Sequence, residues 1–259
     1  MDGPAESIAS LRARIADLGE TRSSAAGALS PVDIGAIDAA LGGGLGRGCL
    51  HEIFAIERDD ASSAAGFAAM LARQLGGTLL WLRLGEAQHR GGSLHAPGLS
   101  EVGCDPARLI LGVLPDPLAL LRAAGDIVRC DEVGVAVVEL WGHPRALDLT
   151  ASRRLAIAAQ QSGVAILMLR IAAEPMPSAA QTRWTVTAAP AAPLAANAPG
   201  RPAFDLQLIR QRGRPAGGAW RVEWNRDLGR FEDPASLSGA VLSLPDGGSA
   251  GAGQWRRSA

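Results

Sequence analysis

The sequence contains no lysine, and all 25 of its basic side chains are arginine. A phosphate-binding P-loop of the pattern G-x-x-x-x-G-K-S/T places a lysine ammonium at the end of its glycine turn, where it reaches the terminal phosphates of a nucleotide. A standard P-loop is therefore excluded. Tyrosine is also absent, while alanine and glycine are abundant. Mutational pressure in a GC-rich genome is thus an alternative cause of the missing lysine.

Cysteine is scarce, and the three residues Cys49, Cys104 and Cys130 show no CxxC spacing. This pattern argues against a zinc site or a disulfide framework and favours a reducing cytoplasm. Long hydrophobic runs are missing too, because the longest, such as 133–138 and 164–169, fall far short of the ~20 residues that span a bilayer. The acidic N-terminus does not resemble a signal peptide.

Charge is balanced overall but uneven along the chain. The formal net charge is -1 and the isoelectric point is about 6.4, so no global basic field points to nucleic acid or to a membrane surface. Residues 201–259, however, carry nine arginines and six acidic residues. The four histidines match no metal spacing, and His51 is expected to be structural. We identify no catalytic residue, metal ligand or cofactor-binding residue.

The N-terminal region, residues 1–28, is expected to be an amphipathic helix followed by a linker. Within 5–19 the apolar residues follow one another at intervals of three, four and three, which is typical of a helical stripe. The members of this stripe are Ile8, Leu11, Ile15 and Leu18. The stripe either packs on the chain's own core or docks on a partner.

Residues 29–231 alternate short apolar runs with helical stretches, which predicts an α/β core with a mostly parallel central sheet flanked by helices. The expected strands are 49–54, 78–84, 109–113, 133–140 and 164–171, and the expected helices are 30–41, 62–75, 117–130 and 152–162. Residues 85–98 read as irregular and 188–202 as a loop. Residues 204–210 and 219–224 predict a C-terminal β-hairpin, and 232–259 a disordered tail.

Residues 29–54 resemble the entry segment of RecA-family ATPases. In that segment a helix ends in a glycine cluster, which a Gly-x-hydrophobic-x-Glu-hydrophobic motif follows. Here Asp38, the glycines of 42–48 and Glu52 match it. Collinear resemblance extends to about residue 224 and includes the Walker B strand at 135–140. The resemblance implies a RecA-like core.

The resemblance breaks where RecA proteins place their P-loop. Residues 55–66 read AIERDDASSAAG, with no glycine turn and with three carboxylates where phosphate would lie. We therefore interpret this region as a vestigial nucleotide site, in which a serine caps the following helix rather than holding magnesium. The residues of the vestigial site are Glu57, Arg58, Asp59, Asp60, Ser62 and Glu139. The segments that match the DNA-binding loops, 141–150 and 172–181, carry only Arg145 as a cation, which predicts weak or indirect DNA contact.

A degenerate RecA-like chain with an N-terminal helix and an arginine-bearing hairpin is similar to the ImuA family, and its architecture also resembles the cell-division inhibitor SulA. Similarity to ImuA implies a non-catalytic accessory role in SOS-induced translesion synthesis. The implied partners are ImuB, which is a Y-family polymerase homologue, RecA and an error-prone replicative-type polymerase. Two alternatives stay open: a divergent ATPase that uses Arg58 in place of the lysine, and a SulA-like inhibitor of a filament-forming protein. Formation of a homo-oligomer is open as well.

The hairpin supplies the second candidate partner surface, beside the N-terminal stripe. Its arginines alternate with tryptophans, a combination suited to acidic partners or nucleic acid. The candidate residues are Arg210, Arg212, Arg214, Trp220, Arg221 and Trp224. The alternative is a solvated hairpin whose tryptophans pack on the sheet.

Overall fold

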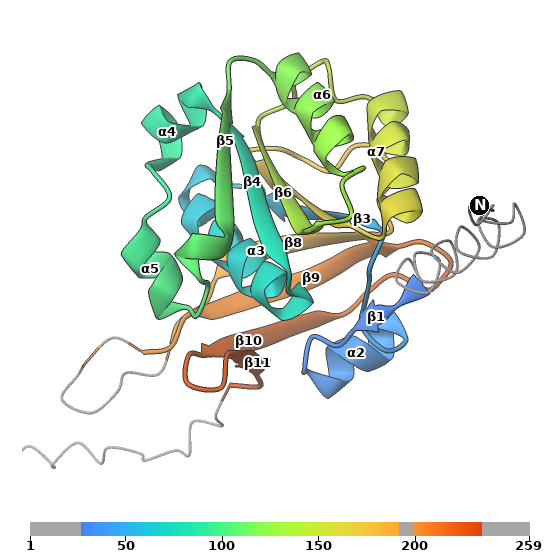
Figure 1. Cartoon of the computed structure of the whole chain (residues 1–259). Helices are drawn as coiled ribbons and strands as arrows, with labels where there is room; N and C mark the ends of the chain where they lie inside the picture. Colours follow the sequence, from blue (N-terminus) through green and yellow to red (C-terminus); the bar gives the residue numbers. More distant parts are fainter. Residues whose placement is uncertain (1–26, 192–197, 199, 235–259) are drawn as a thin grey trace, which may run out of the picture.

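The computed structural model describes residues 27–191, 198 and 200–234, which form an α/β structure around one large sheet (Figure 1). The sheet has nine strands in the order β11-β10-β9-β8-β3-β7-β6-β4-β5. The strands are β3 (Leu50–Ala55), β4 (Thr78–Leu84), β5 (Leu109–Leu114), β6 (Val133–Trp141), β7 (Ala165–Ile171), β8 (Thr182–Ala188), β9 (Ala203–Gln211), β10 (Ala219–Asn225) and β11 (Arg230–Glu232).

Within this order, the strands β8, β3, β7, β6, β4 and β5 run parallel to one another. Strands β9, β10 and β11 continue the sheet beyond β8 as antiparallel neighbours. A separate antiparallel pair joins β1 (Leu29–Ser30) to β2 (Leu45–Gly46). The helices are α2 (Gly35–Leu41), α3 (Ala61–Leu75), α4 (Gly85–Gly91), α5 (Ala96–Glu101), α6 (Pro117–Ile127) and α7 (Leu149–Ser162). The predicted fold class and the predicted β9-β10 hairpin are confirmed. Among the described residues, no helix is long and apolar enough to cross a membrane.

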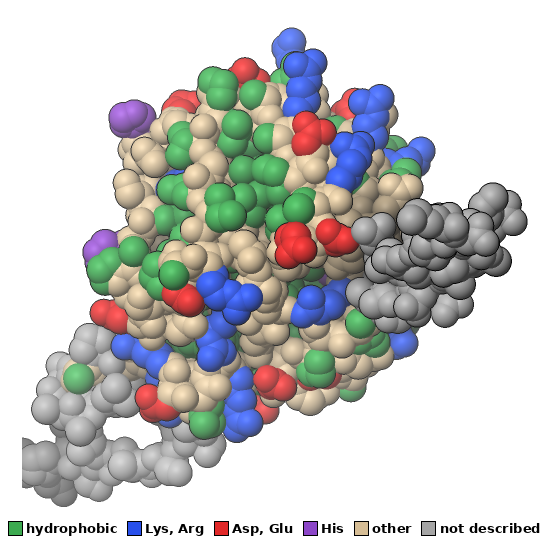
Figure 2. Space-filling view, in the orientation of Figure 1, with side chains coloured by type: hydrophobic (Ala, Val, Ile, Leu, Met, Phe, Trp, Pro, Cys, Tyr) green, Lys and Arg blue, Asp and Glu red, His purple; other side chains and the backbone are tan. Residues whose placement is uncertain are grey.

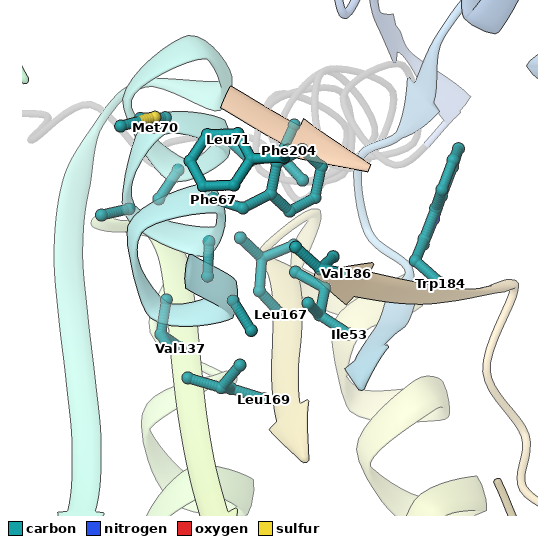
Figure 3. Close-up of a cluster of buried hydrophobic side chains, with 14 of the residues drawn as sticks. Ile53, Phe67, Met70, Leu71, Val137, Leu167, Leu169, Trp184, Val186 and Phe204 are labelled. Carbon is teal, nitrogen blue, oxygen red and sulfur yellow. The ribbon is translucent and has the colours of Figure 1, made fainter. Parts of the chain in front are cut away.

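Two hydrophobic cores cover opposite faces of the sheet. On the first face the sheet packs against α3, and Figure 3 shows Phe67 and Leu71 of this helix facing the side chains of several strands. On the second face it packs against α6 and α7. Strand β6 supplies both cores, because Val135 and Val137 point to the first and Ala136 and Val138 to the second. Burial on both faces explains its continuous apolar sequence.

Three local expectations were wrong. The helix expected from residue 30 begins at Gly35, because Ser30 pairs with Leu45 in the small sheet. The stretch 85–98, read as irregular from its glycines, contains α4 and part of α5, each held to the protein by one buried residue, Ala87 and Leu99. Strand β8 was not predicted, although it pairs in parallel with β3 and its Trp184 and Val186 enter the first core. In all three cases tertiary pairing outweighs local propensity.

The glycine cluster after α2 is structural. Gly42 ends the helix in a left-handed conformation. Gly44 has φ 132°, and a Cβ built there would lie 2.3 Å from the carbonyl oxygen of Ser30. Asp38 serves both ends of α2. Its carboxylate accepts hydrogen bonds from the backbone N–H groups of Val32 and Asp33 before the helix, and its carbonyl oxygen accepts one from Gly43 after it. These residues fix the entry into β3, and Gly42 packs against Arg214 of the hairpin.

His51 has the structural role that its strand position predicts. Its side chain is fully buried, with Nδ1 2.8 Å from Oγ1 of Thr182 and Nε2 2.9 Å from the carbonyl oxygen of Gly46. Burial lowers the pKa of His51 from 6.5 to about 4, which the hydrogen bond to Gly46 only partly offsets. The ring is therefore held neutral in the fold.

We expect His51 to make the fold acid-sensitive. Between pH 6.5 and about pH 4 the unfolded chain protonates His51 and the folded chain does not, so stability falls as pH falls. The slope approaches ~1.4 kcal/mol per pH unit in this window. Urea unfolding at several pH values should show this slope, and His51→Gln should flatten it. The exposed His89→Gln is the control, and equal slopes in the two variants would contradict the assignment.

Candidate functional site

The connection between β3 and α3 stands where a RecA protein would hold nucleotide phosphates. It consists of residues 56–60, and Arg58–Asp60 form a 3-10 turn that leads directly into α3. The non-glycine residues with positive φ in the described chain are Asp33 and Ala172, so none lies in this connection. Without left-handed residues the backbone N–H groups do not form an anion-binding nest.

A carboxylate of the chain itself occupies the end of α3. Asp60 is the N-cap residue, and its Oδ1 accepts a hydrogen bond of 2.8 Å from the backbone N–H of Ala188, at the end of β8. Glu57 and Asp59 are exposed beside it. The positive end of the helix dipole, which would attract phosphate, therefore faces negative charge. The predicted capping serine is wrong, because Ser62 lies exposed inside α3.

Glu139, near the end of β6, is buried and has both oxygens engaged. Oε1 accepts hydrogen bonds from Arg83 at 2.9 Å and from the indole of Trp141 at 2.8 Å. Oε2 accepts one from the indole of Trp81 at 2.9 Å. The exposed fraction is 2% for Glu139 and 3% for Arg83. The carboxylate that would serve a metal-bound nucleotide in a RecA site is thus committed to side chains of the protein.

Further contacts extend this arrangement toward the surface. Arg83 donates a second hydrogen bond to the carbonyl oxygen of Gly92, after α4. The Trp141 ring packs so closely on Gly91 that a Cβ there would lie 2.7 Å from it. Above the same ring lies the guanidinium of Arg58, 6.0 Å from the ring centroid. Arg58 does reach the vestigial site, where it lies over an indole.

This arrangement offers little chemistry for a nucleotide. The described residues contain no group of three or more His, Cys, Asp or Glu side chains placed to hold a metal ion. Glu86, in the first turn of α4, is exposed and pairs with Arg90 one turn later in the same helix. The connection carries three acids and one arginine. Glu139 is thus enclosed by its own hydrogen-bond partners, whereas the small pocket beside it is lined by Glu86, Trp141 and His143 and not by Glu139.

A second buried ionic cluster lies on the opposite face of the sheet. Arg183 Nε lies 2.9 Å from Oε2 of Glu52, without the alignment of a hydrogen bond, and Arg170 Nη1 lies 3.9 Å from Oε1. Ser178 donates to Glu52 and accepts from Arg183, at 2.7 Å each. The pKa of Arg170 is lowered, mainly because burial removes water from the guanidinium. The nearby carboxylate of Glu52 raises it in part, and the nearby positive charge of Arg183 lowers it further. Two arginines and one glutamate leave one excess positive charge.

Strand alternation divides the predicted hairpin surface. Trp224 is fully buried, and its indole donates to the carbonyl oxygen of Val102. Trp220 is half-buried and packs near Trp184, with ring centroids 6.1 Å apart. The structure therefore removes Trp224 from the predicted surface, as the alternative of tryptophans packed on the sheet required. The reason is the two-residue period of β10, which turns both indoles toward the first core.

The arginines of the hairpin have different surroundings. Arg221 forms a bidentate pair with Asp205, which lowers the pKa of that carboxyl. Arg214 packs its guanidinium on Gly42, where a Cβ would lie 2.2 Å from it. Arg210 and Arg212 are exposed and line a groove on the second face of the sheet, together with Arg153 of α7. We call this the arginine groove. Its lining residues are Gly48, Cys49, Leu50, Leu149, Arg153, Ala156, Ile157, Gln160, Ser178, Ala179, Ala180, Gln181, Arg210 and Arg212.

Comparison with known proteins decides the family. No family model matches the chain. It is 32% identical over 194 residues to Protein ImuA from two strains of Caulobacter vibrioides, NA1000 / CB15N and ATCC 19089 / CIP 103742 / CB 15, covering 68% of this chain and 75% of ImuA. The chain belongs to the ImuA family. The structure of the RadB recombinase superposes with a TM-score of 0.54 at 16% identity, covering 80% of this chain and all of RadB, which establishes a RecA-like fold.

Several residues of this ImuA family member were not found from the sequence. Trp81 and Arg83 lie on β4, directly beside the strand that carries Glu139, and their alternation on that strand was the available signal. Arg153 lies far from Arg210 in sequence, so only the fold brings the two into one groove. The apolar stripe of the predicted N-terminal helix, from Ile8 to Leu18, lies outside the described residues.

We expect the Glu139 cluster to stabilise this ImuA family member strongly. Glu139→Ala leaves Arg83 as an uncompensated buried charge, which should lower the free energy of unfolding by about 3–5 kcal/mol. The double variant Arg83→Met with Glu139→Gln should lose less, because no buried charge remains and the amide oxygen still accepts from an indole. Urea unfolding measures both.

A matched surface pair provides the control for this experiment. Glu86→Ala breaks the exposed ion pair with Arg90 and should cost no more than about 0.5 kcal/mol. Arg83→Met and Glu139→Gln are also measured singly. If the double variant lost as much stability as these two single variants together, the pair would not be coupled and the interpretation of the cluster would fail.

Proposed function

We propose that this ImuA family member is a non-catalytic RecA-like accessory protein of SOS-induced, error-prone translesion synthesis. It acts by binding ImuB, with RecA as a second partner, and thereby serves the error-prone replicative-type polymerase. The observation that carries the proposal is the committed state of Glu139. Its oxygens are bonded to Arg83, Trp81 and Trp141, and the phosphate-binding turn is replaced by an acidic 3-10 turn.

The segments that match the DNA-binding loops of RecA proteins, 141–150 and 172–181, support the same accessory role. The two connections that would hold single-stranded DNA in a RecA protein are joined to each other, because the backbone N–H of Glu174 donates to Nε2 of His143. The second connection is also anchored to the core by Ser178. Arg145 is the cation that these segments supply. Contact with DNA through one cation is weak, so the proposal assigns the function to protein partners.

We expect the purified chain neither to bind nor to hydrolyse ATP with magnesium. Isothermal calorimetry should give no binding heat for the wild type, and phosphate release should stay at the buffer level. Arg58→Ala should change neither result, because Arg58 lies over Trp141 rather than in an anion nest. Turnover that Glu139→Gln abolishes would overturn the non-catalytic assignment, and binding that Arg58→Ala abolishes would favour the divergent ATPase.

Partner capture tests the other half of the proposal. The tagged full-length chain, co-expressed with ImuB, should retain it through purification in salt of physiological strength. Leu11→Glu with Ile15→Glu tests whether the N-terminal stripe contributes. Retention of a filament-forming division protein instead of ImuB from damaged cells would favour the SulA-like alternative and contradict the proposal.

A further inference from the structure

The arginine groove lies on the second face of the sheet, where residues of α7, the end of β9 and the start of β3 line it. Its volume is about 810 Å³, toward the upper end of the roughly 300–1,000 Å³ of ligand-binding clefts. A groove of this size suits a segment of polypeptide better than a small anion. A different, apolar surface lies elsewhere on the molecule, where Figure 2 shows hydrophobic side chains gathered around β5.

The charge of the groove has one sign. Its lining residues include three arginines, Arg153, Arg210 and Arg212, and no acidic side chain. All three are exposed, and within the described chain none of their guanidiniums forms an ion pair. Other exposed arginines of the same region do pair, as Arg221 does with Asp205. The groove therefore keeps a positive potential that its surroundings do not neutralise.

The buried cluster behind the groove wall adds to this potential. Ser178 belongs to both, because it lines the groove and bonds Glu52 and Arg183. That cluster carries one excess positive charge, supplied by Arg170 and Arg183 against Glu52. Charge in a low-dielectric wall is screened less than charge in water. An anionic group in the groove thus faces three exposed guanidiniums and a positively charged wall.

The groove also offers apolar contacts beside its polar ones, which bear on the choice between two anionic ligands. Leu149 and Ile157 of α7 are 43% and 49% exposed and line it together with Ala156, Ala179 and Ala180. Single-stranded nucleic acid is usually held by aromatic stacking, and the groove has no aromatic lining residue. A peptide with carboxylates and aliphatic side chains can contact both the arginines and the exposed Leu149 and Ile157.

We propose that the arginine groove binds an acidic segment of a partner protein, with carboxylates on Arg153, Arg210 and Arg212 and aliphatic side chains on Leu149 and Ile157. The inference deepens the proposed accessory role and rests on it, since it identifies the kind of partner segment that such a protein would hold. The hairpin arginines and α7 then form one binding site, although they are far apart in sequence.

The test uses the full-length chain and defined probes. A fluorescein-labelled peptide of Asp, Glu and Leu should bind, as measured by fluorescence anisotropy, and its counterpart with Asn and Gln in place of the acids should not. The triple variant Arg153→Glu, Arg210→Glu, Arg212→Glu should weaken binding by about tenfold or more. If it does not fold, as judged by circular dichroism, the triple change to Gln replaces it. Ile157→Asn should weaken the binding of the same peptide.

The matched control places the same charge change elsewhere on the surface. Arg108→Glu, Arg122→Glu and Arg226→Glu alter three exposed arginines outside the groove and should leave the Kd within about twofold. Equal weakening by both triple variants would overturn the proposal. Oligothymidylate that binds as tightly as the peptide, and loses binding in the groove variant, would identify a nucleic-acid site and also overturn it.

Further results distinguish this proposal from occupation of the groove by the chain's own N-terminal segment and from failure of the proposed accessory role. Peptide binding that is absent in the wild type and appears in Leu11→Glu with Ile15→Glu would show that the chain's own N-terminal segment fills the groove, which overturns the proposal. ImuB retained by the wild type but lost by the groove variant supports it. If the wild type and the groove variant retain ImuB equally and bind the peptide equally, the groove proposal is overturned and the proposed accessory role is unaffected. Groove-dependent peptide binding without ImuB retention supports the groove and removes the accessory role.

Discussion

The burial of Glu139 is the constraint on which the vestigial site depends. A carboxylate near the end of a strand that is covered on both faces loses its hydration and is stable only when charge and hydrogen bonds replace it. Arg83 supplies the charge, and Trp81 and Trp141 supply two further donors. In a nucleotide-binding RecA protein a metal ion and water would meet that need. Here the chain meets it alone, and the site is closed as a result.

The same cluster shows what arginine provides in this chain that lysine would not. A guanidinium has five N–H donors in a fixed planar fork, whereas an ammonium is a compact point charge. Arg83 uses that fork to join Glu139 to the carbonyl oxygen of Gly92, which connects the sheet to α4. Arg170 similarly reaches both Glu52 and the carbonyl oxygen of Gly142. Mutational pressure accounts for a shortage of lysine, but it does not account for the acidic 3-10 turn before α3 or for the engaged carboxylate of Glu139.

The sequence was sufficient for features that depend on local pattern. Continuous apolar runs predicted five of the six parallel strands, with β4 at its observed bounds. Features that depend on pairing across the sheet were missed. The β1-β2 pair shortens α2, β3 recruits β8, and the position of Trp224 required the strand phase that only the structure fixes. The arginine groove required Arg153 and Arg210 to be brought together from different elements.

The short connection between β7 and β8 bears on both proposals, the weak contact with DNA and the arginine groove. Residues 172–181 contain no helix, and they are held against the protein by the hydrogen bonds of Ser178 to Glu52 and of the Ala179 N–H to Ser152. A longer insertion there would offer a DNA-binding loop, and it would also cover the sheet beside α7. Because the connection is short and anchored, a strip of the second face stays open between α7 and the hairpin. Two arginines project into that strip from β9 and the residue after it, and a third from α7. The proposed partner surface therefore depends on this connection staying short and anchored.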